Sequence, residues 1–387
     1  MKKNRLLPLF LLTVVVVVIA IVTARKQTPT VEQEHALLFP ELKTTINDLN
    51  ELSVQQGSKT LTLDNEAGTW KVREADGHPA LFSKIKQAAI AVSELRVLEE
   101  KTKDPQQYAT LGVEDPAADK AESRLLTLKD KSGKQLAALI VGKNRISRAA
   151  AGNQGLYVRL PGQAQALLVA GDLDVGVAAA DWMDKNLVNI AAERIRQIDI
   201  AHGDTRLSLR RDKADANLVP DPIPAGKRAR SDYVAERMAG ILDNITLDDV
   251  KAAAKVEFPA DAVTTTVRTN DGLTAVITSA AIDSKDYARF TFQYTASAQP
   301  EAATAPAPET KPAAAQPAQA PAEGAKKEEQ PAAPKRDVAR EVADLNAKTA
   351  GWVYQIPSYK FDTFTRKLDD LIEDLPKEEP ARKATKK

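Results

Sequence analysis

Apolar and polar residues alternate along two stretches of the chain in the same arrangement. The pattern of residues 49–63 returns at residues 195–209 without a gap, at a constant offset of 146 (195 − 49). The shared positions are apolar or glycine: Leu49/Ile195, Leu52/Ile198, Val54/Ile200, Gly57/Gly203, Leu61/Leu207 and Leu63/Leu209. Alternation on both sides of a central glycine predicts a two-stranded hairpin. The agreement of six positions at one offset indicates an internal duplication.

A second pair of segments supports the duplication at a different offset. Residues 127–133 resemble residues 266–272, with an offset of 139 (266 − 127), and each segment reads as a strand entering a turn. The later turn is Asn270-Asp271-Gly272, a strong hairpin signal. Each copy is therefore expected to contain two hairpins.

Helical spacing follows the first hairpin and closes the chain. Ile85, Ala88, Ala89 and Val92 lie at helical spacing after Pro79. In the second copy we expect helices over residues 233–242 and 361–375, the last with a clean apolar stripe. Helices interspersed with hairpins predict an α+β fold, in which two tandem related units of antiparallel sheet with packed helices follow one N-terminal transmembrane helix.

The expected domain boundaries follow from these elements. Residues 1–5 form a cytoplasmic N-terminus, residues 6–24 a transmembrane helix, and residues 25–45 a polar connector. The first α+β unit covers residues 46–191 and the second covers residues 192–375. Residues 376–387 form a charged tail.

The N-terminal apolar run determines the expected location. Basic residues precede Leu6 and an almost wholly apolar run continues to Ala24, which is just long enough to span a bilayer. The positive charge ahead of the run favours a cytoplasmic N-terminus and a periplasmic remainder. We therefore expect a single-pass protein of the cell inner membrane, with a cleaved signal peptide as the alternative.

A segment rich in proline and alanine interrupts the second unit at residues 297–336. Eight of the 22 prolines of the chain lie there, without an aromatic or branched apolar residue. Such a composition cannot bury enough surface to offset the entropy of ordering. We expect a disordered insertion in a hairpin loop, at the place that residues 142–155 take in the first unit.

Charge and cysteine content exclude several classes of protein. The 387 residues carry 54 basic and 53 acidic side chains, a formal net charge of +1, so no bulk field attracts nucleic acid. The chain has no cysteine. Disulfides, thiolate catalysis and cysteine-ligated metal sites are therefore excluded.

No arrangement of residues predicts catalysis, a cofactor or a metal site. Gly142-Lys143 lacks the remaining residues of a phosphate-binding loop, and the three histidines lack ligand spacing. Acidic pairs such as Asp248-Asp249 are typical of solvated surfaces. Trp182, in the sequence Asp-Trp-Met-Asp-Lys, is the aromatic residue least explained by strand packing, and we take Trp182, Asp184 and Lys185 as a candidate partner contact.

Several motifs in order resemble one bacterial family. They are Trp70-Lys71-Val72, the helix start at Pro79-Ala80, the element Tyr108 to Pro116, the stretch Leu139 to Lys143 before Tyr157-Val158, and the junction Trp182 to Leu187. In this order they resemble the family called domain of unknown function 4340. The chain departs from the family pattern by an Ala-Thr insertion after Tyr108 and by Met183 in place of an arginine. The resemblance implies an exported, membrane-tethered accessory protein without established catalytic residues, associated with ABC-type export or gliding machinery.

Three functional hypotheses follow. The first is a non-catalytic, membrane-tethered periplasmic accessory protein of an ABC-type transport complex, whose partners are the inner membrane and the permease and ATPase subunits. The second is a periplasmic protein that binds a glycan or peptide in the cleft between the two units. The third is a hydrolase that uses an acid pair.

Overall fold

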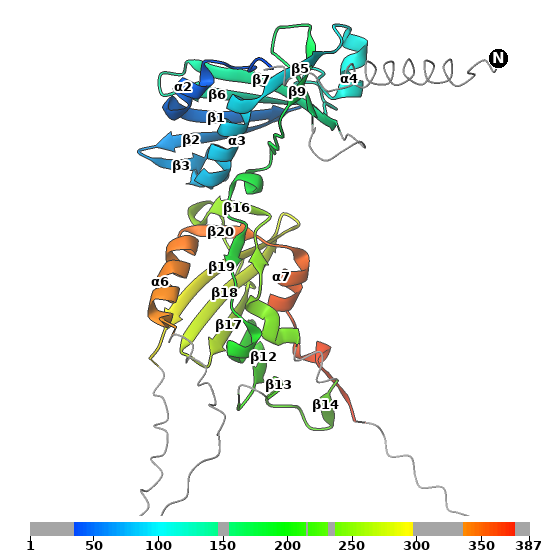
Figure 1. The fold of residues 1–387 in the computed structure, drawn as a ribbon. Coiled ribbons are helices and arrows are strands. Elements are labelled where there is room, and N and C mark those ends of the chain that lie inside the picture. The colour runs from blue at the N-terminus through cyan, green and yellow to red at the C-terminus, as the bar shows by residue number, and fades with distance from the viewer. Residues whose placement is uncertain (1–34, 146–154, 214–215, 231–236, 297–335, 376–387) are drawn as a thin grey trace, which may run out of the picture. The chain divides into compact units, whose positions relative to one another are not determined.

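The computed structural model describes residues 35–145, 155–213, 216–230, 237–296 and 336–375. The chain forms two compact units, one of residues 1–62 and 82–177 and the other of residues 63–81 and 178–387. Two large antiparallel sheets dominate the described residues (Figure 1). The predicted boundary at residues 191 and 192 stays a prediction.

The first sheet has nine strands in the order β4-β3-β2-β1-β6-β7-β8-β9-β5. Their bounds are β1 Leu49–Gln56, β2 Lys59–Glu66, β3 Thr69–Val72, β4 His78–Pro79, β5 Arg96–Glu100, β6 Arg124–Asp130, β7 Gln135–Arg145, β8 Gly155–Arg159 and β9 Ala166–Ala170. The helices that precede or interrupt this sheet are short: α2 Leu42–Thr45, α3 Phe82–Glu94 and α4 Tyr108–Leu111.

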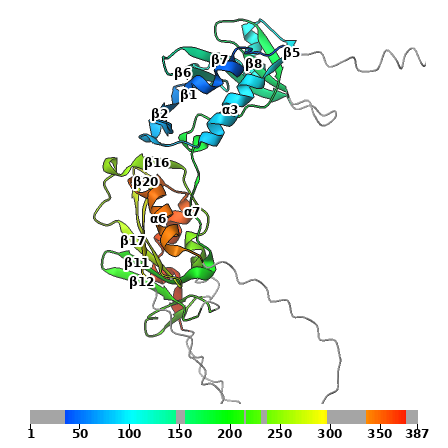
Figure 2. The same ribbon diagram turned by 60° about the vertical axis from the view of Figure 1, so that its left-hand side comes forward.

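The second sheet has eight strands in the order β13-β12-β11-β17-β18-β19-β20-β16. Their bounds are β11 Ile195–His202, β12 Thr205–Arg210, β13 Val219–Pro220, β16 Asp249–Ala252, β17 Val263–Thr269, β18 Leu273–Ile282, β19 Lys285–Tyr294 and β20 Trp352–Gln355. Two small sheets pair β10 Asn186–Val188 with β15 Ile245–Thr246, and β14 Lys227–Ala229 with β21 Ile372–Asp374. Helices α6 Val338–Thr349 and α7 Ser358–Phe364 both contact β18 and β19 (Figures 1 and 2).

The two sheets repeat one topology, which agrees with the duplication read from the sequence. Strands β2-β1-β6-β7-β8-β9-β5 take the same order as β12-β11-β17-β18-β19-β20-β16. The registers agree as well, because Leu52 pairs with Leu128 where Ile198 pairs with Val267. An irregularity in pairing also falls at equivalent positions, after Leu49 in one sheet and after Ile195 in the other.

The element Tyr108 to Pro116, which carries part of the family resemblance, has a structural role. Tyr108 is buried, and its hydroxyl donates a hydrogen bond of 2.5 Å to the carbonyl oxygen of Ala164. The guanidinium of Arg159, on β8, lies 4.7 Å from the centre of the Tyr108 ring. Arg289, on β19, lies in the same way over Phe258 at 5.4 Å. An arginine–aromatic contact thus holds the connection between β5 and β6 in the first copy and the connection between β16 and β17 in the second.

The predicted α+β class is wrong, because the described fold is mostly antiparallel sheet with few and short helices. The predicted helix over residues 361–375 ends at Phe364, and Ile372 lies in a strand paired with β14. Of the helix expected over residues 233–242, Met238–Leu242 is a 3₁₀ helix and residues 233–236 lie outside the described residues. Only the helix after Pro79 is confirmed, as α3, with Ile85, Ala88, Ala89 and Val92 buried.

No helix among the described residues combines the length and apolar character that a membrane crossing needs. This finding contradicts the predicted single-pass inner-membrane location and the transmembrane helix of the predicted fold. The segment expected to span, residues 6–24, itself lies outside the described residues, as do residues 297–335 of the expected insertion and the expected tail, residues 376–387.

The position of the insertion in the repeat also needs correction. It falls between β19 and β20, and these strands correspond to β8 and β9. The equivalent place in the first sheet is therefore the short connection of residues 160–165, and not residues 142–155 as predicted.

Candidate functional site

A shallow groove of about 390 Å³ runs between α6 and β10 in the second unit. Leu187 and Leu345 provide its apolar surface. Charged side chains of α6 provide the rest: Asp337, Arg340, Glu341, Asp344 and Lys348. The predicted junction at residues 182–187 leads directly into this groove.

The sequence of α6 explains why a helix forms beside the groove. Asp337 is the N-cap, and its carboxylate accepts a hydrogen bond of 3.0 Å from the amide of Arg340. Val338 and Val342 lie on the buried face, and burial of each contributes about 1.5–3 kcal/mol. With only these two apolar side chains buried in α6, polar contacts must contribute much of its attachment.

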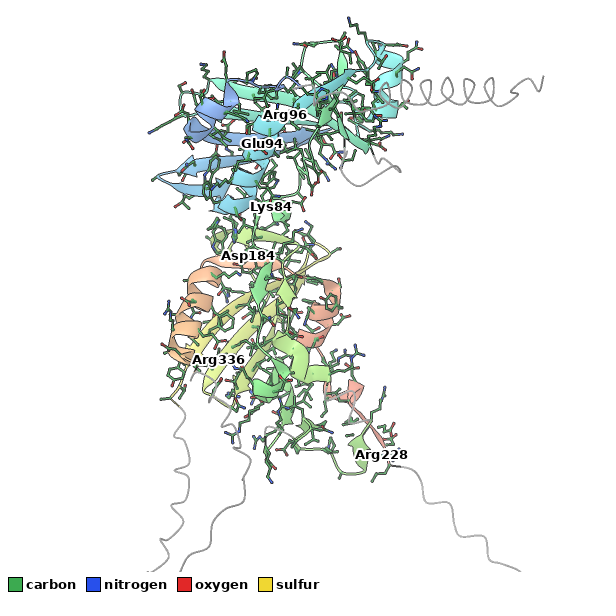
Figure 3. All side chains as sticks on the ribbon, in the orientation of Figure 1. Lys84, Glu94, Arg96, Asp184, Arg228 and Arg336 are labelled. Carbon is green, nitrogen blue, oxygen red and sulfur yellow. The ribbon has the colours of Figure 1, made fainter. Side chains whose placement is uncertain are left out.

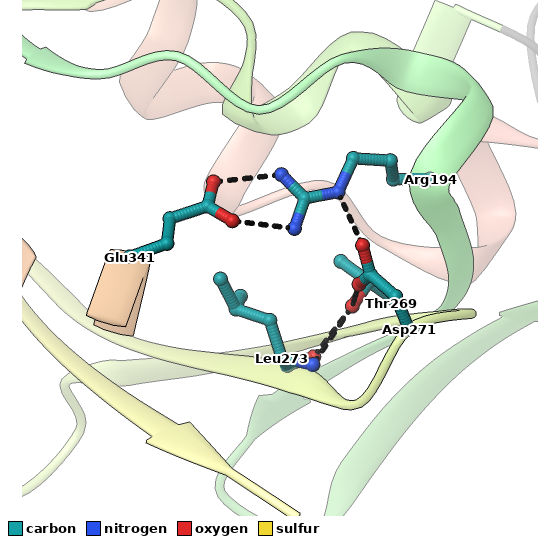
Figure 4. A network of polar contacts seen from close by, with 5 residues as sticks. All are labelled: Arg194, Thr269, Asp271, Leu273 and Glu341. Atoms are coloured by element: carbon teal, nitrogen blue, oxygen red, sulfur yellow. Dashed lines mark hydrogen bonds and ion pairs between the residues drawn. The ribbon is translucent and has the colours of Figure 1, made fainter. Parts of the chain in front are cut away.

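The first polar attachment is a network around Arg194, at the end of the 3₁₀ helix Ala192–Arg194 (Figure 4). Its guanidinium donates to both carboxylate oxygens of Glu341 on α6, at 2.7 and 2.8 Å. Its Nε donates at 2.9 Å to Asp271, in the turn between β17 and β18. Thr269 donates to the other Asp271 oxygen at 2.5 Å. One arginine thus ties α6 to the start of β11 and to a hairpin turn.

Burial and charge act in opposite directions on this network. Burial alone would lower the pKa of Arg194, which is 8% exposed, but the two carboxylates raise it above its ordinary value. Burial alone would raise the pKa of Asp271, but hydrogen bonds from Thr269 and Arg194 hold it below 3.8. Both shifts favour the charged forms of Arg194 and Asp271.

Two further attachments hold the second half of α6. The ammonium of Lys348 lies 2.6 Å from the Asp184 carboxylate and also donates to the carbonyl oxygen of Asn186. The side-chain amide of Asn346 bonds to both backbone groups of Phe292 on β19, at 2.9 and 2.7 Å. Figure 3 labels Asp184 and Arg336, which mark the junction ahead of β10 and the residues that precede α6.

The structure separates the three residues of the predicted partner contact. Asp184 is exposed and pairs with Lys348, which lines the groove. Trp182 is 2% exposed and belongs to the core, so its side chain cannot meet a partner on this surface. Lys185 is exposed and pairs with Asp181 at 3.1 Å. That this junction meets a partner stays a prediction, and among the three residues Asp184 is the one that pairs with a residue lining the groove.

Sequence reasoning missed Glu341 and Asn346, because it assigned no helix to residues 338–349, and it missed Arg194, whose partner Glu341 lies in that helix. A signal was present: Asp337 as N-cap, Glu341 in the first turn, and the buried positions Val338, Val342 and Thr349 at helical spacing.

Within the described ranges, no group of three histidine, aspartate or glutamate side chains is placed to hold a metal ion. His202 contacts the carbonyl oxygen of Arg366 at 3.3 Å, and His78 contacts that of Pro79 at 3.0 Å.

The fold and its repeated registers define a protein built from a duplicated antiparallel sheet. A family model described as domain of unknown function (DUF4340) matches residues 70–270, which is more than half of the chain. The chain therefore belongs to that family, and the resemblance read from the motifs is confirmed. No curated protein and no solved structure matches the chain.

Proposed function

We propose that this protein is a non-catalytic accessory protein that binds a partner protein at the groove between α6 and β10. The observation that carries the proposal is the composition of the groove, in which half-buried Leu345 and buried Leu187 are lined up with charged side chains of α6, so that Leu345 offers the apolar contact. Apolar surface with a polar rim is typical of protein interfaces. The family resemblance suggests the subunits of an ABC-type transport complex as the partner.

Two charged side chains define the kind of segment that fits the groove. Arg340 and Asp344 line it one helical turn apart, whereas Glu341 and Lys348 are engaged by Arg194 and Asp184. No ion pair joins either Arg340 or Asp344 to another described residue. A partner helix with one acidic and one basic residue a turn apart, flanking an apolar side chain, matches this pattern.

The test is co-purification of the tagged full-length chain with its complex. We expect an ABC-type permease and its ATPase in stoichiometric amounts, and at least tenfold less of both with the double variant Arg340→Glu, Asp344→Lys. The matched control reverses two exposed charges, Asp204→Lys in the turn between β11 and β12 and Arg206→Glu near the start of β12, and should retain both subunits.

Two outcomes would overturn the proposal. Undiminished recovery of the permease and ATPase with the folded Arg340→Glu, Asp344→Lys variant would exclude the groove as the binding site. Recovery without any transporter subunit would exclude the partner class. The glycan- or peptide-binding alternative stays a prediction, and a ligand retained in native mass spectra would favour it.

A further inference from the structure

The corner that follows β3, residues 73–79, packs against the edge formed by β16 and β20. This corner belongs to the second compact unit, as do the two strands. The carboxylate of Asp76 accepts a hydrogen bond of 2.9 Å from the amide of Ala252, the last residue of β16. The ring of His78 lies 4.7 Å from that of Trp352 on β20, and His78 is buried. The edge of β16 is thus a docking edge for a corner of the chain.

The corner that follows β13, residues 221–227, is the counterpart of this corner in the second copy. Leu63 and Leu209 occupy equivalent positions of the duplication. They pair with Val72 and Pro220, which are the last residues of β3 and β13. Every residue of the second corner is exposed. The same corner is therefore docked in one copy and exposed in the other.

Large apolar side chains are exposed at the second corner. Ile223 is 40% exposed, and Val219, just ahead of the corner, is 43% exposed. Leu375 is 52% exposed, and its amide donates a hydrogen bond of 3.0 Å to the carbonyl oxygen of Gly226. Apolar side chains that are exposed together indicate an interaction site.

The counterpart of the docking edge is the edge strand of the first sheet, β5. Strands β5 and β16 take the same place in the order of their sheets, and the registers make Glu99 the counterpart of Asp249. By the same register, Thr102 is the counterpart of Ala252, whose amide binds Asp76. The first copy therefore has its own version of the edge on which a corner docks.

A groove of about 280 Å³ lies at this edge and is called the β5 groove. Glu99, Glu100 and Lys101 line it beside Thr102, so its charged side chains sum to −1. Half-buried Leu111, at the end of α4, adds an apolar side chain. The β5 groove thus combines an acidic strand edge with an apolar contact.

The second corner matches the β5 groove in charge and in apolar character. Lys227 ends the corner and Arg228 follows it, and these cations are opposite in sign to the groove. They form surface ion pairs with Asp374 at 3.3 Å and with Glu373 at 2.6 Å. Such pairs contribute little to stability and are easily exchanged. Ile223 provides the apolar side chain of the corner.

We propose that the corner of residues 221–227 docks in the β5 groove of a second copy of this chain, as residues 73–79 dock on β16 within one chain. Each chain offers one such corner and one such groove, so the contact is heterologous and copies add head to tail. The groove between α6 and β10 takes no part in this contact. The inference therefore stands apart from the proposed function.

Two variants of the full-length chain test the contact by analytical ultracentrifugation. Ile223→Asp places a charge in the corner, and Thr110→Trp fills the β5 groove from an exposed position. Each variant should weaken self-association about tenfold or more. Tyr359→Asp and Thr60→Trp make the same kinds of change at other exposed sites and should associate as the unchanged chain does.

A mixture of the two variants distinguishes a head-to-tail contact from a two-fold one. Ile223→Asp keeps an intact groove and Thr110→Trp keeps an intact corner, so the equimolar mixture should form dimers and nothing larger. A chain that stays monomeric throughout the micromolar range would overturn the proposal. So would undiminished association of either variant alone, or a mixture that forms no dimers. These measurements use the isolated chain, so a failed co-purification affects only the proposed function.

Discussion

At the scale of single residues, Arg194 contributes more to the stability of the second unit than its position in the sequence suggests. It precedes a strand and reads there as an ordinary surface arginine. The reason for its burial is Glu341, which lies 147 residues further along the chain. A pairing over that distance leaves no periodic trace, so it was not predictable from the sequence.

Removal of the Arg194 guanidinium should destabilise the second unit. Arg194→Ala leaves the carboxylates of Asp271 and Glu341 without their cation, and their side chains are 31% and 25% exposed. Loss of one partner of a fully buried pair costs about 3–5 kcal/mol. Partial exposure reduces the expected loss to about 2 kcal/mol. Urea unfolding measures it, and Arg196→Ala, an exposed neighbour, should change the stability by less than about 0.5 kcal/mol.

Two aspartates give the second unit a defined dependence on pH. Burial would raise the pKa of Asp199, but hydrogen bonds from Ser208, Gln197 and Arg268 hold it below 3.8, as with Asp271. A carboxyl group with a lowered folded-state pKa stabilises the fold fully above its unfolded-state value. That stability is lost as the pH falls through the folded-state value.

We therefore expect the free energy of unfolding to fall from about pH 5 to about pH 3. Asp271→Asn should reduce the size of that fall, because its carboxyl group no longer titrates. Denaturant midpoints at several pH values measure it, with Asp204→Asn as control. An equal fall in Asp271→Asn and in the unchanged chain would contradict the assignment.

At the scale of elements, local patterns predicted hairpins well and helices poorly. Alternation around Gly57 and Gly203 specified both strands of each hairpin, because side-chain period and turn lie within one short window. The stripe from Phe361 to Leu375 misled, since Ile372 is buried by pairing with β14, about 145 residues earlier. A periodic apolar stripe indicates which residues are buried. Whether they form a helix or a strand depends on the segment with which they pack or pair.

The hairpin turns allow a graded prediction. Gly57 and Gly203 have φ values of +56° and +54°, and a Cβ there meets no atom closer than 3.6 Å. Alanine at either position should therefore cost about 1–2 kcal/mol, from backbone strain alone. At Gly272, with φ of +93°, a Cβ would also collide with the carbonyl oxygen of Thr295. Gly272→Ala should thus be clearly the most destabilising of the three in urea unfolding; equal losses would contradict the geometry.

At the scale of the whole molecule, the topology of the sheets was partly predictable. The two constant offsets predicted that the chain repeats itself, and the strand orders agree with that. The pairing of β5 at the far end of its sheet, next to β9, was not predictable, because it joins segments about 70 residues apart. The exposure pattern of β5 does not indicate that β9 is its neighbour.

We expect that residues 298–335 can be shortened without loss of stability in the second unit. Among the described residues, those that hold α6 are Arg194, Asp184 and Phe292, which lie outside this segment. Replacement by a Gly/Ser linker of about twelve residues should leave the melting temperature within about 2 °C, because loop closure entropy changes slowly with length. Thermal unfolding followed by circular dichroism measures it. A loss of several degrees would mean that the segment itself stabilises the fold.

The two offsets differ by seven, because β2 and β6 are seven residues further apart than β12 and β17. The copies therefore diverged in length within their connections while their strands kept one register. Each copy is in consequence an internal reference for the other. Substitution of a side chain that only packs the sheet should lower stability at both equivalent positions. A side chain whose substitution has an effect in a single copy indicates a function acquired after the duplication. Asn346, which lies in a connection much longer than its counterpart at residues 160–165, is the residue at which to begin that comparison.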